Sequence, residues 1–109
     1  MAEDFVLKRG DCLPALEAIL QDAEGRGVDL AGATVRLLWR PAGDSSAVVS
    51  ARTATVTDAA AGAVRVDWQA GDLDTAGAYV AELEADFGGL KLTFPNSRFL
   101  KFRVVEDLG

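Results

Sequence analysis

Histidine is absent from this 109-residue sequence, and cysteine, methionine and tyrosine each occur once. The lack of histidine excludes a Ser-His-Asp or Cys-His catalytic site and removes the commonest zinc ligand. The single cysteine, Cys12, cannot form an internal disulfide, which is typical of chains that fold in a reducing cytoplasm. No neighbour of Cys12 in the sequence would activate it as a nucleophile, so we expect an ordinary thiol near a strand end.

Basic residues are outnumbered: 11 Lys and Arg stand against 17 Asp and Glu, for a net charge of −6. Nucleic-acid phosphates and anionic lipid surfaces would be repelled by this charge, so we expect neither as a partner. No apolar run approaches the length of a membrane span. The acidic N-terminus, Met1 to Asp4, lacks the basic and apolar regions of a signal peptide, which predicts synthesis and folding in a cytoplasm.

Short segments of alternating apolar and polar residues make up most of the chain, the period of a strand with one buried face. Turn residues separate these segments about every 8–12 residues. The pattern predicts one all-β domain over residues 1–109, an immunoglobulin-like antiparallel β-sandwich of about 7–8 strands. The expected strands cover residues 5–9, 13–21, 33–40, 47–57, 64–68, 79–87, 90–94 and 99–105.

Residues 13–21 are ambiguous, because Leu13, Leu16, Ile19 and Leu20 also fit the apolar stripe of a helix. Pro14 is compatible with the first turn of a helix and with an edge strand. We interpret the segment as a strand, since every segment after it has the pattern of a strand.

The stretch from Trp68 to Phe87 is the main basis for the fold prediction. A polar turn leads into a strand through Asp74, Gly77 and Tyr79. This arrangement resembles a tyrosine corner, in which a tyrosine hydroxyl bonds back to the upstream backbone; we expect the acceptor near Asp74. Inward register in the predicted strands makes four residues core anchors: Trp39, Trp68, Leu83 and Phe94.

Seven segments follow one another in a distinctive order: FVLKRGD at 5–11, LPAL at 13–16, DAEG at 22–25, VDLAGATVR at 28–36, AAGAVRVDW at 60–68, DTAGAY at 74–79 and TFPN at 93–96. Together they resemble the N-terminal immunoglobulin-like domain of phage baseplate upper proteins. The resemblance implies a non-enzymatic structural component of a phage tail or baseplate. It further implies a virion location, assembly in the host cytoplasm, and many copies docked to other virion proteins.

Carboxylates suggest two kinds of chemistry that we weigh against simpler explanations. Asp67, Asp72 and Asp74, or Asp22 with Glu24, could offer oxygen ligands to calcium. Their spacing does not match a calcium loop, and aspartate is an ordinary turn residue, so we expect no metal and no cofactor. Two of Asp67, Glu82 and Glu84 could form a carboxylate pair like that of a glycosidase. These positions lie on the predicted solvent-exposed faces of their strands, so we expect solvated charges instead.

Charged strand faces offer a docking surface for other proteins. Its expected residues are Arg36, Arg40, Glu82, Glu84, Asp86, Lys101 and Arg103, with the loop at 41–46 beside them. Ion pairing across strands explains the same charges, and the sequence leaves both explanations open.

The alternative function is a carbohydrate- or receptor-binding sandwich, and a capsid-decorating or neck protein of the same fold is a third possibility. Trp39 and Trp68 could stack on a sugar, but their inward register favours the core. Phe99 is the main aromatic residue out of inward register, so a host glycan is a disfavoured partner.

Overall fold

The computed structural model describes residues 4–95 and 100–106 of the chain. Every regular element in these residues is a β-strand, and they contain no helix. The fold is therefore all-β, as the alternating pattern predicts. The strands are β1 (Phe5–Lys8), β2 (Leu16–Ile19), β3 (Thr34–Pro41), β4 (Ser50–Asp58), β5 (Ala63–Val66), β6 (Gly77–Asp86), β7 (Lys91–Phe94) and β8 (Leu100–Val105).

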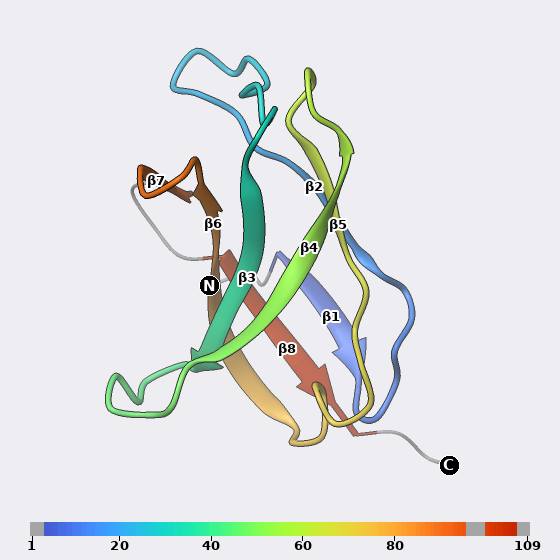
Figure 1. Ribbon diagram of the computed structural model, residues 1–109. Helices are drawn as coiled ribbons and strands as arrows, with labels where there is room; N and C mark the ends of the chain where they lie inside the picture. Colours follow the sequence, from blue (N-terminus) through green and yellow to red (C-terminus); the bar gives the residue numbers. More distant parts are fainter. Residues whose placement is uncertain (1–3, 96–99, 107–109) are drawn as a thin grey trace.

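The eight strands form one curled, mixed sheet in the order β1-β8-β6-β3-β4-β5-β2, with β7 paired to β6 (Figure 1). All pairings are antiparallel except that of β1 with β8, which is parallel. The predicted antiparallel sheet is therefore wrong at this one pairing. A parallel pair needs a long connection, and here nearly the whole chain lies between its two strands.

The curl depends on β4, whose nine residues change partner along their length. Residues from Ser50 to Ala54 pair with β3, whereas those from Thr55 to Asp58 pair with β5, with a register shift between Val56 and Asp58. Such irregularities increase local twist and bend a strand. Across the inside of the curl, Trp68 after β5 contacts Phe102 of β8, and Ala18 of β2 lines the same groove as Leu83 of β6.

The ambiguous segment 13–21 contains the strand β2, so the strand interpretation is confirmed and the helical one is wrong. Several expected bounds differ by a few residues, most of all at β2, which covers Leu16–Ile19 rather than 13–21, and β4 begins at Ser50 rather than at residue 47. The expected start of the last strand, Phe99, lies outside the described residues, as do Asn96, Ser97 and the first three residues.

Aromatic rings form the centre of the core around Phe102, which is fully buried. Phe5 and Tyr79 stack on Phe102 from the two neighbouring strands, with ring centroids 5.0 and 5.1 Å away. Trp68 contacts Phe102 at 5.8 Å and meets Trp39 edge to face at 5.5 Å. The aromatic residues thus join β1, β8, β6 and β3 to the segment after β5.

Gly62 fixes the position of β2 against the turn between β4 and β5. Its carbonyl accepts a 2.8 Å hydrogen bond from the Leu20 N–H, and its φ is +75°. A Cβ atom at this position would lie 2.6 Å from the Leu20 carbonyl oxygen. Only glycine satisfies both the positive φ and the close backbone approach.

Candidate functional site: the outer face of β3, β6 and β8

Cross-strand register places most of the expected docking residues on the outer face of three strands. Arg36 lies opposite Glu84 and Leu38 opposite Glu82, while Val80 lies between Arg40 and Lys101. Arg103 is opposite Ala78 on the same face. The outer face (Arg36, Leu38, Arg40, Val80, Glu82, Glu84, Lys101 and Arg103) is therefore one continuous surface.

Two of the expected docking residues form an ion pair within the chain. The Arg36 Nε donates to Glu84 Oε1 at 2.9 Å, with the arginine side chain 46% exposed and the carboxylate 16% exposed. Asp86 has a different role, because its carboxylate accepts a 2.7 Å hydrogen bond from the Gly89 N–H in the β6–β7 turn. The expected acidic strip of three residues is thus reduced to Glu82 and Glu84.

Apolar side chains occupy the middle of the outer face. Leu38 and Val80 are half-buried there, and Val49, just before β4, is 52% exposed. They line a shallow hollow of about 110 Å³ together with Arg40 and Glu82. An apolar centre surrounded by charged residues is the usual anatomy of a protein–protein interface.

The tyrosine corner lies at the end of the sheet where β6 begins. The Tyr79 hydroxyl donates to the Thr75 carbonyl at 2.6 Å, one residue beyond the expected acceptor region at Asp74. Burial raises the pKa of the Tyr79 phenol above its usual value. Gly77 is the first residue of β6 and has a φ of +148°, whereas Asp74 is exposed in the turn.

A second interaction at this end of the sheet was not predicted from the sequence. Arg52 and Asp72 form a bidentate ion pair. The Arg52 Nε lies 3.0 Å from Asp72 Oδ2, and the Arg52 Nη2 lies 2.6 Å from Asp72 Oδ1. Asp72 Oδ2 also accepts the Gln69 N–H at 2.8 Å. This hydrogen bonding with Asp72 raises the pKa of the Arg52 guanidinium. No sequence signal joins the two residues, because they are 20 positions apart in different elements.

Three of the four expected core anchors are buried. Trp39, Trp68 and Leu83 are each less than 5% exposed, which confirms their placement in the core. Phe94 is only half-buried and packs against the core from its margin. It lies on β7, which pairs with β6, and it lines a groove shared with Ala18 of β2. The burial of both tryptophans removes the sugar-stacking platform that they could have formed.

The expected carboxylate clusters do not assemble into a metal site. Asp67 pairs with Arg65 at 2.8 Å, Asp72 is bound by Arg52, and Asp22 accepts backbone N–H groups of its own turn. Within residues 4–95 and 100–106, no three Asp, Glu, Cys or His side chains are grouped closely enough to hold a metal ion. Cys12 is exposed.

Comparison with protein-family models gives no match, and comparison with curated proteins also gives none. The described residues include no helix that is long and apolar enough to cross a lipid bilayer.

Proposed function

We propose that this chain is a non-enzymatic structural domain of a phage tail or baseplate, which docks in multiple copies to neighbouring virion proteins. The seven ordered segments that resemble baseplate upper proteins support the virion assignment. The geometry of the outer face supports docking as the mode of action, because stable assembly requires a complementary surface rather than a reactive group.

The fold that we propose within this function is an immunoglobulin-like sandwich. One layer would contain β2 and β5, and the other would contain β1, β8, β6 and β3. The Tyr79 hydroxyl supports this proposal, since it bonds to a backbone carbonyl four residues upstream, at the start of a strand. The aromatic core between Trp39, Trp68 and Phe102 provides the contact between the two layers.

The apolar hollow on the outer face is the observation that carries the docking proposal. In an isolated domain the apolar side chain of Val49 remains in contact with water, which is unfavourable in free energy. A partner that covers the hollow would remove Val49, Leu38 and Val80 from water together. Arg40 and Glu82 at its rim would then orient the partner through their charges.

Incorporation into particles tests the proposal. We expect Val49→Lys and Glu82→Lys to fold normally and to lower the copy number in purified particles, measured by quantitative mass spectrometry. Thr55→Lys is the matched control, because Thr55 is an exposed β4 residue in the half that pairs with β5. Unchanged copy number in both face variants would exclude the outer face as the docking site. Absence of the unmodified protein from particles would exclude the virion role.

Arg36 and Glu84 need a separate experiment, since their charges already satisfy each other. The double variant Arg36→Glu with Glu84→Arg reverses the local charge pattern but keeps an ion pair and the net charge. Normal incorporation of this variant would assign the pair to the domain's own stability, whereas reduced incorporation would place it in the docking contact.

A further inference from the structure

The outer edge of β2 presents backbone hydrogen-bonding groups away from the sheet. β2 is the last strand in the sheet order, and within the described part of the chain it pairs only with β5. The Leu20 N–H donates to the Gly62 carbonyl, in line with the β2–β5 ladder. Because hydrogen-bonding direction alternates along an antiparallel strand, the even-numbered residues point toward β5. The N–H and C=O groups of Glu17 and Ile19 therefore point outward.

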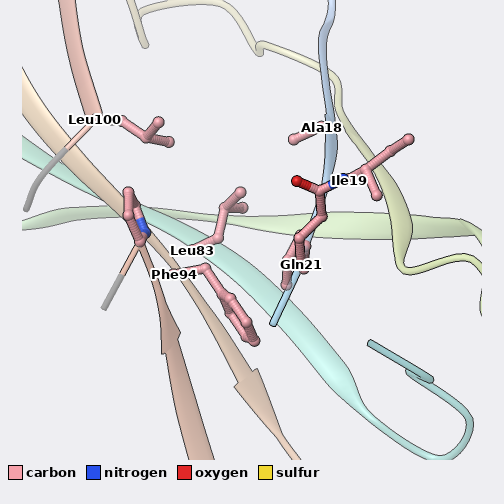
Figure 2. Close-up of a pocket in the computed structure, with 8 residues that line it drawn as sticks. Ala18, Ile19, Gln21, Leu83, Phe94 and Leu100 are labelled. Carbon is pink, nitrogen blue, oxygen red and sulfur yellow. The ribbon is translucent and has the colours of Figure 1, made fainter. Parts of the chain in front are cut away.

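An apolar groove of about 260 Å³ runs along this edge. Figure 2 shows Ala18, Ile19 and Gln21 on one side of the space, and Leu83, Phe94 and Leu100 on the other. One wall is therefore a strand edge with outward backbone groups. The opposite wall is made of inward-facing side chains from β6, β7 and β8.

Exposed apolar side chains occur on β2 and β7, the two strands that contribute Ala18 and Phe94 to the lining of the groove. Ile19 is 58% exposed on β2, and Leu92 is 47% exposed on β7, although Leu92 pairs with the buried Ala85 on the inner face. Natural edge strands are commonly protected by charges, prolines or bulges, because an open edge is a template for another strand. Within β2 only Glu17 has a charge, and nothing of this kind protects the edge at Ile19.

We propose that the β2 edge and its groove bind an extended segment of a partner protein, which adds to the sheet as a further strand next to β2. A compact ligand would satisfy the groove but not the outward groups of Glu17 and Ile19, whereas a strand satisfies both. Alternate residues of the segment would be aliphatic, to contact Leu83, Phe94 and Leu100. The net charge of −6 and the outward Glu17 favour lysine or arginine among its remaining residues. This site is separate from the outer face of β3, β6 and β8.

A short synthetic peptide in which valine alternates with lysine and threonine is the probe. We expect it to slow amide hydrogen exchange at Glu17 and Ile19 by about tenfold or more, measured by NMR. The amide of Ala18 should change little, because it already faces β5. The control peptide has the same sequence with methylated backbone nitrogens along its pairing edge, and should give no protection.

Two variants separate strand addition from simple adhesion to an apolar surface. Ile19→Pro removes an outward N–H and leaves the ladder to β5 intact, and Ala18→Asp adds a charge on the inward face of β2 that lines the groove. Both should weaken peptide binding at least about tenfold, the loss expected when a key interfacial contact is removed. Val49→Asp, at an outer-face residue about as exposed as Ile19, should bind normally.

Three results would overturn the proposal. The first is no protection of Glu17 and Ile19 at millimolar peptide in a folded protein. The second is equal binding of the methylated peptide, which would indicate apolar adhesion without strand pairing. The third is protection that rises with protein concentration in the absence of peptide, which would assign the edge to a second copy of this chain.

Discussion

The guanidinium of Arg52 and the carboxylate of Asp72 form two hydrogen bonds, at 2.6 and 3.0 Å, between β4 and the loop that leads into β6. The Asp72 side chain is only 9% exposed. Because the carboxylate also accepts the Gln69 N–H, it both orders its own loop and connects that loop to β4 at one end of the sheet. We expect Asp72→Ala to lower the free energy of unfolding by about 1.5–3 kcal/mol, as measured by urea denaturation.

A more exposed ion pair provides the control for this measurement. Arg65 and Asp67 are 44% and 52% exposed, so Asp67→Ala should cost less than about 1 kcal/mol. A double-mutant cycle with Arg52→Ala and Asp72→Ala should give a coupling free energy well above that of the Arg65–Asp67 pair. Equal coupling in the two pairs would mean that Arg52 and Asp72 contribute no more than a surface contact.

The Tyr79 hydroxyl is expected to stabilise the corner. Tyr79→Phe keeps the ring stacked on Phe102 but leaves the Thr75 carbonyl without its 2.6 Å donor. The expected loss is about 1–3 kcal/mol, the usual cost of an unsatisfied group, read from the denaturation midpoint. An unchanged midpoint would show that water replaces the hydroxyl at no cost.

Stability should also depend on the ionisation of Tyr79 at high pH. Burial raises the folded-state pKa of this phenol above 10.0, so the unfolded chain ionises at lower pH than the folded one. The resulting stabilisation is fully present below the unfolded pKa of about 10 and is lost as pH rises through the folded pKa. Since Tyr79 is the only tyrosine, phenolate absorbance should titrate at higher pH in native protein than in urea. Coincident titrations would contradict this expectation.

Substitutions at Gly62 and Gly10 distinguish the cost of a positive φ from the cost of steric overlap with a Cβ atom. Both have positive φ, at +75° and +83°, but only Gly62 lies against backbone atoms that a Cβ would overlap. Gly10→Ala should therefore cost about 1 kcal/mol for the backbone conformation alone. Gly62→Ala should cost about 2 kcal/mol more, because the Leu20 carbonyl must move. Thermal denaturation of the two variants under the same conditions makes the comparison, and equal losses would refute the crowding at Gly62.

Alternation of apolar and polar residues was sufficient to predict β3, β6 and β8, because each has a buried face and a wetter face. It also placed Trp39 and Trp68 inside the core. The extent of burial of Phe94 could not be predicted, since inward register says which way a side chain points but not whether another strand covers it. β7 pairs with the half of β6 that does not pair with β8, and this arrangement depends on topology rather than on local sequence.

The contacts that link distant segments were beyond a reading of local patterns. The Arg52–Asp72 pair joins a strand to a loop, and both residues are ordinary in their own surroundings. The central position of Phe102 depends on the stacking of Phe5 and Tyr79, which are far from it in the sequence. Residues of the outer face could be named from the sequence, but their pairing needed the register between β3 and β6.

The parallel pairing of β1 with β8 determines how the domain would respond to mechanical load. In a parallel pair the chain enters β1 at one end and leaves β8 at the other, from the Asp4–Lys101 bond to the Arg9–Val105 bond. A force that pulls these two ends apart acts along the strands, so the hydrogen bonds between them are loaded in shear and must break together. A force on an antiparallel terminal pair would open the bonds one at a time. Tension applied between the start of β1 and the end of β8 would therefore be resisted by the whole ladder at once.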